Sequence, residues 1–325
     1  MLSFSLIVES GVIKFMAVSI GDGVGMKVAI VGSGFVGEAT GKGLAKHNNH
    51  VVFLDISEKR VTTLRESGLE AYQPNEYPKI TTDVTMFCVP TPTQGKNIQL
   101  TYLQDAITEF ATRLKDHKKY HVVVIRSTVP PLTTRNVVAP IIEKVSGKKI
   151  GKDFGLVMQP EYLREATANS DFSRPWFVLI GEYDKKSGDV VEKLYKPFNA
   201  PIERCAIEEA EIQKYVHNVY NAVKIAFFNE MRIAINAKGW NADKVFLATA
   251  ESCEGLWNAM YGLKDYGPFD GSCLPKDTRA LLEWGENHGF NFGILRSVIE
   301  ENLKHEKIIG KNKTVRVNYL QNIEL

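Results

Sequence analysis

From residue 26 onward, short apolar segments alternate with helix-forming segments, and this alternation restricts the fold more than any other feature of the chain. Helical spacing of apolar residues recurs in segments such as 38–47 and 101–115. Such an alternation predicts an α/β domain with a Rossmann-like, doubly wound parallel sheet. Buried strands are predicted for the apolar runs 27–32 (KVAIVG), 51–55 (VVFLD), 85–89 (TMFCV), 121–125 (HVVVI), 154–160 (FGLVMQP) and 176–181 (WFVLIG).

The segment Gly32–Gly37 (GSGFVG) has the form GxGxxG and stands between the first predicted strand and the first predicted helix. In that context the glycines permit a tight turn, close approach of backbone to a pyrophosphate, and close helix–strand packing. Asp55 ends the second strand, where a carboxylate accepts hydrogen bonds from a ribose diol and repels a 2′-phosphate. NAD is therefore the expected cofactor, although Lys59 and Arg60 nearby weaken the preference over NADP. The alternative is a glycine-rich turn without a ligand.

After about residue 200 the pattern changes to helices alone. Residues 208–239 form one long helical segment without proline, and further helical segments follow it. In this part of the chain the sequence suggests one short strand, at 314–320 (TVRVNYL). We therefore predict an N-terminal extension (1–25), an NAD-binding Rossmann domain (26–200), an all-helical central domain (201–305) and a tail (306–325).

Composition excludes several classes of protein. The formal net charge is +2, which argues against a nucleic-acid partner or a membrane surface. No apolar run of spanning length occurs, and the first 25 residues lack the basic start of a signal peptide. The four cysteines have no CxxC or Cys/His ligand spacing, so we expect no disulfide framework, no metal site and a reducing, cytoplasmic location.

Two helical segments carry candidate chemistry. Cys273 stands at a helix start with Lys276 three residues on, a setting that favours a nucleophilic thiolate. The alternative is a small apolar residue at a helix start. Lys214 and Asn218 lie four residues apart on one face of the long helix, among apolar neighbours. Lys214 is then either a partly desolvated functional cation or a solvated lysine near the helix start.

Two predicted strand ends carry the remaining candidates. Glu161 and Glu165 follow the strand at 154–160, and Thr128 follows the strand at 121–125. Ligands of open α/β sheets bind outside the carboxyl ends of the strands, so these side chains are candidate acid/base groups or cofactor contacts. The alternatives are an exposed glutamate pair at a helix start and an ordinary turn.

Taken together, several motifs resemble the nucleotide-sugar 6-dehydrogenases, the family of the UDP-glucose and GDP-mannose 6-dehydrogenases. The resemblance runs in family order over residues 27 to about 305. It rests on VAIVGSGFVG, CVPTPT, RSTVPP, QPEYLREATA, KYVHNVYNAVKIAFFNEM and GSCLPKDTRAL.

The resemblance implies an NAD-dependent, four-electron oxidation of a sugar C6 alcohol to a uronate through a thiohemiacetal and a thioester on Cys273. UDP-glucose, giving UDP-glucuronate for polysaccharide biosynthesis, is favoured because it is the commoner substrate in the family, with GDP-mannose as the alternative. The implied catalytic residues are Cys273 as nucleophile, Lys214 and Asn218 at the oxyanion, Asp277 as the carboxylate that works with water, Glu161 as acid/base in thioester hydrolysis, and Thr128 as the residue that positions its water.

The resemblance also implies binding residues and partners. A homodimer through the central helical domain is the candidate assembly. Implied cofactor contacts are Gly32, Ser33, Gly34, Phe35, Val36, Gly37, Asp55, Arg60, Val89, Thr91, Pro92, Thr93, Ser127, Glu165 and Lys276. Implied substrate contacts are Tyr162, Leu163, Lys264, Tyr266, Phe269 and Asp270, the last four in a loop over the sugar.

Three departures from the family pattern keep other functions open. The chain stops where family members continue into a further nucleotide-binding domain, the family's glycine pair before the cysteine reads Asp270-Gly271, and the loop 255–266 lacks an arginine. A carboxylate at Asp270 disfavours a thiolate nearby. The alternatives are a non-catalytic NAD-binding subunit and a two-electron hydroxyacid dehydrogenase, which needs no cysteine.

Overall fold

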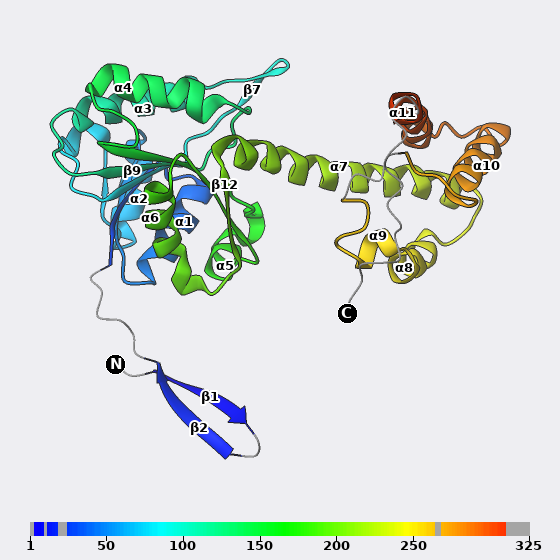
Figure 1. The fold of residues 1–325 in the computed structure, drawn as a ribbon, viewed down its shortest axis with the longest axis horizontal. Coiled ribbons are helices and arrows are strands. Elements are labelled where there is room, and N and C mark those ends of the chain that lie inside the picture. The colour runs from blue at the N-terminus through cyan, green and yellow to red at the C-terminus, as the bar shows by residue number, and fades with distance from the viewer. Residues whose placement is uncertain (1–2, 10–11, 19–24, 264–267, 310–325) are drawn as a thin grey trace. The chain divides into compact units, whose positions relative to one another are not determined.

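Eight strands form one sheet in the order β12-β11-β10-β9-β6-β3-β4-β5 (Figure 1). The computed structural model describes residues 3–9, 12–18, 25–263 and 268–309. All neighbouring strands of the sheet are parallel except β10 and β11, so the predicted Rossmann-like fold is confirmed. The strands are β3 (Lys27–Val31), β4 (His50–Leu54), β5 (Ala71–Tyr72), β6 (Val84–Phe87), β9 (His121–Ile125), β10 (Phe154–Met158), β11 (Val178–Glu182) and β12 (Ile202–Ala206).

One strand departs from the predicted parallel arrangement. β11 runs antiparallel to β10, with Met158 opposite Gly181. The helix between them, α5 (Ala168–Ser173), has 6 residues. The connection between the two strands, residues 159–177, therefore begins and ends at the same edge of the sheet, and β11 starts at the edge where β10 ends.

Helices cover both faces of the sheet, each over its own apolar core (Figure 1). On one face lie α1 (Phe35–Ala45), α2 (Glu58–Glu66), α5 and α6 (Lys185–Tyr195). On the other lie α3 (Thr101–Leu114), the π-helical turn η2 (Thr134–Val138) and α4 (Ala139–Ser146). Shorter elements are β1 (Ser3–Glu9) with β2 (Val12–Val18), β7 (Thr93–Gln94) with β8 (Asn97–Ile98), and the 3-10 helices η1 (Pro74–Glu76), η3 (Glu165–Thr167) and η4 (Lys196–Phe198).

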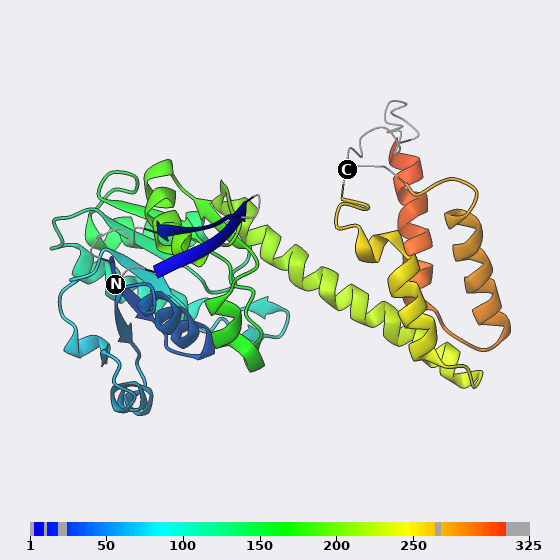
Figure 2. The same ribbon diagram turned by 90° about the horizontal axis from the view of Figure 1, so that it is seen from below.

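The chain divides into two compact units, residues 1–216 and 217–325. Residues 217–263 and 268–309 contain helices and no strand. The prediction of helices alone after residue 200 is wrong at β12, which lies at 202–206 and pairs with β11 as the edge strand of the sheet. Within this second unit α10 and α11 lie side by side (Figures 1 and 2), and Ala234, Phe292 and Leu295 form its apolar core. The helices are α7 (Ile207–Ala237), which begins in the first unit, α8 (Ala242–Ser252), α9 (Glu254–Trp257), α10 (Leu274–Asn287) and α11 (Gly293–Ile309).

Two further expectations concern the ends of the chain and the membrane. The strand suggested at 314–320 lies outside the described residues. Among the residues that the structure describes, no helix has the length and apolarity to cross a bilayer.

The contact between α1 and β3 depends on Gly37. An added Cβ there would lie 2.0 Å from the carbonyl oxygen of Gly32 and 3.1 Å from Cγ2 of Ile30. We expect Gly37→Ala to lower the free energy of unfolding by about 2 kcal/mol, because backbone must move. Gly34→Ala is the control, since nothing lies within 4 Å of its added Cβ and its φ is −61°. Equal losses in the two variants, measured by urea denaturation, would contradict this.

A second prediction concerns acid stability. His121 is fully buried in β9, where Nδ1 lies 3.1 Å from the Thr82 carbonyl oxygen and Nε2 lies 2.9 Å from Oγ1 of Thr85. Burial lowers the pKa of His121 from 6.5 to about 3. Between those values the unfolded chain binds a proton that the native state does not, so stability present above pH 6.5 is lost as the pH falls.

We therefore expect the unfolding free energy of His121→Gln to fall less below pH 6.5 than that of wild type, by on the order of 3 kcal/mol at pH 4. The variant loses buried hydrogen bonds and is less stable at pH 7, so the slope against pH is the quantity to measure. His305→Gln, on the exposed side of α11, is the control and should keep the wild-type slope. An unaltered slope in His121→Gln would show that this imidazole does not cause the acid sensitivity.

Candidate active site

The turn between β3 and α1 leaves part of its backbone open to a ligand. Gly32 has φ +85°, and an added Cβ there would lie 2.9 Å from the carbonyl oxygen of Cys88. Nothing lies within 4 Å of an added Cβ at Gly34, so a ligand can approach the backbone at this point. α1 begins at Phe35, and the first N–H groups of an α-helix have no partners inside the helix. The predicted cofactor segment Gly32–Gly37 therefore fits the diphosphate of NAD.

Asp55 lies at the carboxyl end of β4, beside the glycine turn. Its carboxylate accepts the N–H of Ser33 at 2.7 Å and the N–H of Ser57 at 2.9 Å. Each carboxylate oxygen keeps a further lone pair for a ribose hydroxyl. Arg60 lies next to it in α2, where its Nε donates to the Ser33 carbonyl oxygen at 2.6 Å and its guanidinium pairs with Glu38. Asp55 is thus placed for the predicted role, whereas Arg60 already has an acidic partner.

The segments after β6 and β9 are joined by two hydrogen bonds. Oγ of Ser127 donates to the Val89 carbonyl oxygen at 2.6 Å, and Oγ1 of Thr91 donates to the Thr128 carbonyl oxygen at 2.7 Å. Thr93 begins the short strand β7. These bonds bring the predicted cofactor segment 89–93 and Thr128 together at the carboxyl edge of the sheet.

Lys214 and Glu161 form a buried pair at the same edge. Lys214 is 5% exposed. Its Nζ lies 3.2 Å from Oε1 of Glu161 and also donates to the main-chain carbonyl oxygen of that residue. The other carboxylate oxygen of Glu161 accepts the N–H of Leu163 at 2.6 Å. The lysine is therefore desolvated and not a solvated residue at a helix start, and an acid/base group lies beside it.

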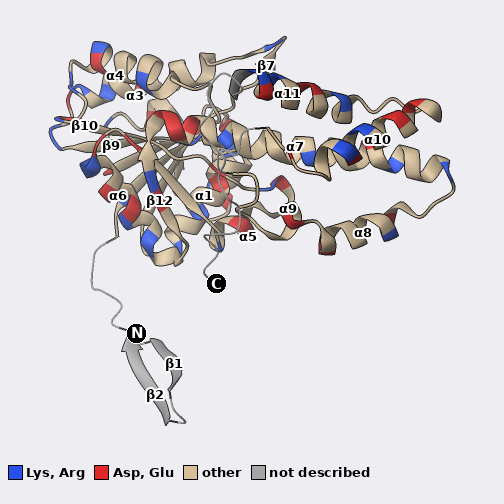
Figure 3. Cartoon of the chain, turned by 45° about the vertical axis from the view of Figure 1, so that its right-hand side comes forward, with Lys and Arg blue, Asp and Glu red and all other residues tan. Residues whose placement is uncertain are grey.

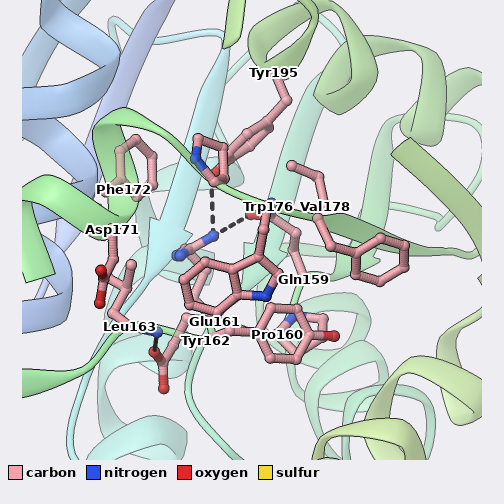
Figure 4. A pocket seen from close by; sticks show the side chains of 13 residues that line it. Gln159, Pro160, Glu161, Tyr162, Leu163, Asp171, Phe172, Trp176, Val178 and Tyr195 are labelled. Atoms are coloured by element: carbon pink, nitrogen blue, oxygen red, sulfur yellow. Dashed lines mark hydrogen bonds between the residues drawn. The ribbon is translucent and has the colours of Figure 1, made fainter. Parts of the chain in front are cut away.

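The residues that follow Glu161 line a pocket that opens to solvent (Figure 4). Tyr162 and Leu163 line it, and the labelled side chains of Phe172, Trp176 and Tyr195 surround it in Figure 4. The hydroxyl of Tyr162 donates to Oε1 of Gln213 at 2.5 Å. Glu165, a predicted cofactor contact, is exposed at the start of η3. The aromatic lining gives this edge of the sheet an apolar wall.

Arg126 lies inside this pocket and is absent from the predicted site. The residue is 3% exposed, and its guanidinium donates to Oε1 of Gln159 and, at 2.9 Å, to the hydroxyl of Tyr195. It also lies 5.7 Å from the ring centroid of Phe172. Arg126 directly precedes Ser127 in the RSTVPP motif, so its position was readable, but its burial depends on α5 and α6.

The remaining predicted residues belong to the second unit. Cys273 is the N-cap of α10, and its side chain is exposed, so it is no buried packing residue. The side chains of Lys276 and Asp277 pair at 2.5 Å, and the N–H of Asp277 donates to the Cys273 carbonyl oxygen at 2.8 Å. Asn218 lies one turn after Lys214 in α7 and is exposed.

The predicted sugar loop is described in part. Lys264 and Tyr266 lie outside the described residues. The backbone N–H of Phe269 donates to Oδ1 of Asn302 at 2.7 Å, and Nδ2 of Asn302 donates to the Phe269 carbonyl oxygen at 3.0 Å. Asp270 follows as an exposed residue. The two units are described separately, so the convergence of Cys273 with Lys214 stays a prediction.

Known proteins resemble the chain over nearly all of its two units. Residues 26–81 and 77–199 match the NAD-binding domain of the UDP-glucose/GDP-mannose dehydrogenase family, and residues 208–304 match its central domain. The chain is 35% identical over 298 residues to GDP-mannose 6-dehydrogenase of Pseudomonas savastanoi pv. phaseolicola. The aligned region covers 85% of this chain and 68% of that protein. It is 31% identical over 311 residues to UDP-glucose 6-dehydrogenase TuaD of Bacillus subtilis, and this aligned region covers 89% of this chain and 66% of that protein.

Structural similarity agrees with the sequence matches. The crystal structure of a ternary complex of GDP-mannose dehydrogenase from Pseudomonas aeruginosa has a TM-score of 0.82 and 31% identity, and covers 89% of this chain and 72% of that one. Both domain matches follow one another along the chain in the order predicted from its motifs. The protein therefore belongs to the UDP-glucose/GDP-mannose dehydrogenase family of NAD-dependent oxidoreductases.

Proposed function

We propose that the protein oxidises the C6 alcohol of a nucleotide sugar to the carboxylate, in two steps that each deliver a hydride to NAD⁺. The observation that carries this proposal is the buried pair of Lys214 and Glu161. The pair lies at the carboxyl edge of the sheet, the edge that also carries Thr128 and the glycine turn. A desolvated ammonium suits an oxygen that gains negative charge, and a neighbouring carboxylate suits proton transfer. Cys273, exposed at a helix start, is the proposed nucleophile.

The proposed substrate is GDP-mannose, with UDP-glucose as the second candidate. The sequence alone favoured UDP-glucose through its frequency in the family. The relatives with 35% identity are GDP-mannose 6-dehydrogenases, and the UDP-glucose 6-dehydrogenase of Bacillus subtilis is 31% identical. Because the identity to the GDP-mannose enzymes is the higher of the two, we favour GDP-mannose as the substrate. Both sugars present the same reacting group, a primary alcohol at C6.

The proposed role of each residue is derived from the hydride and the proton that leave the substrate in each step. The alcohol loses a hydride and a proton, and Lys214 stabilises the oxyanion that precedes the aldehyde. The thiolate of Cys273 then adds to the aldehyde carbon. The thiohemiacetal loses a second hydride and a proton to become a thioester, which water cleaves to carboxylate and thiol. Glu161 takes the proton of that water, which Thr128 positions, while Asn218 and Asp277 support the oxyanion and proton transfer.

The yield of NADH per sugar tests this proposal directly. With limiting GDP-mannose and excess NAD⁺, we expect two NADH per sugar and one uronate, detected by absorbance and mass spectrometry. UDP-glucose is assayed in parallel to compare kcat/KM. One NADH per sugar would instead identify a two-electron dehydrogenase. NAD⁺ binding without turnover of either sugar would identify a non-catalytic NAD-binding subunit.

Replacement of the proposed nucleophile gives a second readout of the same chemistry. Cys273→Ser should abolish uronate formation while NAD⁺ binding, measured by calorimetry, stays within about twofold, because the proposed phosphate cradle lies in residues 32–37. Cys253→Ser is the matched control, since this cysteine is also exposed in the second unit. Uronate production by Cys273→Ser at the wild-type rate would rule out covalent catalysis.

We further propose a homodimer formed through α7. An apolar stripe of exposed residues follows helical spacing on this helix, at Val216, Val219, Tyr220, Val223 and Phe227. Lys224 is the only charged residue between 215 and 229, and Figure 3 shows the same predominance of uncharged residues. At 3.6 residues per turn, Lys214 and Asn218 lie on the opposite side of the helix. A second copy can therefore cover the stripe without covering them.

Val223→Asp should convert the dimer to a monomer, because a carboxylate in an apolar interface loses its hydration. Light scattering coupled to size exclusion measures the mass at several concentrations. Asn229→Asp, an exposed position off the stripe, adds the same charge and should leave the mass unchanged. A wild-type protein that stays monomeric at high concentration would reject the proposed dimer.

A further inference from the structure

Glu38, in the first turn of α1, joins two cations at the cofactor site. Its Oε2 pairs with the guanidinium of Arg60, and its Oε1 pairs with Nζ of Lys42 one turn later in α1. All three side chains are partly shielded from water, with exposed fractions of 25% for Glu38, 29% for Arg60 and 35% for Lys42. The carboxylate therefore neutralises the arginine on the side of the glycine turn.

This cluster is continuous with the ribose-binding position. The N–H of Ser33 donates to Asp55, and the carbonyl oxygen of the same residue accepts from Nε of Arg60 at 2.6 Å. Asp55 and Arg60 thus bind the main-chain N–H and the main-chain carbonyl oxygen of Ser33, respectively. A phosphate on the adenosine ribose 2′-oxygen would meet the Asp55 carboxylate, and Arg60 is the cation within the same cluster that could offset it.

Ionisation of Glu38 persists at neutral pH. Partial burial raises the pKa of Glu38, but hydrogen bonds from Lys42 and Arg60, with the charges of both, outweigh this and lower the pKa below its usual value. A guanidinium recognises phosphate by charge and by paired N–H donors. Since its charge is compensated by Glu38 and two of its nitrogens are engaged, by Ser33 and Glu38, Arg60 has little attraction left for a 2′-phosphate.

We propose that Glu38 is a specificity-determining residue for the cofactor, because it withholds Arg60 from a 2′-phosphate. Asp55 repels that phosphate, and Glu38 occupies the guanidinium of Arg60 that could offset the repulsion. Both acids then act in the same direction, towards NAD⁺ and against NADP⁺. The ammonium of Lys42 completes the cluster, so two carboxylates balance two cations when no cofactor is bound.

Direct binding of the two dinucleotides to the full chain tests this assignment without any sugar substrate. Titration calorimetry gives Kd for NAD⁺ and for NADP⁺ with wild type and Glu38→Gln. We expect Glu38→Gln to bind NADP⁺ about tenfold more tightly than wild type does, with the Kd for NAD⁺ within about twofold. Glu58→Gln is the matched control, because it removes one exposed carboxylate from α2 and should change neither Kd by more than about twofold.

The double variant Glu38→Gln/Arg60→Gln identifies the group responsible. If released Arg60 binds the phosphate, the gain in NADP⁺ affinity disappears in the double variant. Glu38→Ala is the second replacement, since alanine favours helix, and it should show the same gain. Thermal unfolding of each variant and its NAD⁺ affinity report whether the fold is intact.

Four results would overturn the proposal. The first is a wild type that binds NAD⁺ and NADP⁺ with equal affinity, and the second is unchanged NADP⁺ affinity in both Glu38 variants while NAD⁺ still binds. The third is an equal gain in NADP⁺ affinity in Glu58→Gln, and the fourth is a gain in NADP⁺ affinity that persists in Glu38→Gln/Arg60→Gln. None of these results bears on which sugar the protein oxidises, so failure of this assignment is distinguishable from failure of the proposed reaction.

Discussion

The ammonium group of Lys214 is withdrawn from water, and Glu161 supplies acceptors from both its side chain and its main chain. Removing one partner of such a pair leaves an uncompensated buried charge, which costs about 3–5 kcal/mol. Glu211, one turn earlier in α7, is also buried, and its carboxylate accepts the N–H groups of Leu132 and Thr134 at 2.5 and 2.7 Å. The start of α7 is therefore held against the segments that follow both β10 and β9, and this attachment positions Lys214 and Glu161 at the carboxyl edge of the sheet.

The interior of that sheet was predictable from sequence, and its edges were not. Central strands such as β9 are covered on both faces, so they appear as continuous apolar runs. β12 is an edge strand that reads IERCA, and its Arg204 pairs with Glu182, Asp189 and Glu192. Because those partners come from β11 and α6, no local pattern reveals that a charged segment completes the sheet beyond residue 200. The direction of β11 likewise depends on whether segment 159–177 crosses the sheet, which sequence periodicity alone does not reveal.

A similar division runs through the candidate site. The glycine turn, Asp55 and the residues after β9 and β10 could be placed from sequence, because a strand end and a helix start fix their surroundings. The desolvation of Lys214 depends on a partner 53 residues away, and the burial of Arg126 depends on Tyr195, 69 residues away. Sequence spacing reports which residues share an element, whereas burial of a charge is decided by which elements pack together.

Glu38 and Asp55 illustrate how differently two carboxylates contribute to one site. Asp55 accepts two main-chain N–H groups, so it shapes the turn as well as the ribose position, and its replacement alters folding and recognition together. The carboxylate of Glu38 instead pairs with the side chains of Lys42 and Arg60. Such a partly exposed pair contributes little to stability, whereas its charge acts directly on an incoming phosphate. Discrimination at the 2′-position can therefore be separated from the architecture of the turn. The carboxylate of Glu38, which we propose to control it, contacts side chains and not the backbone of the proposed diphosphate cradle.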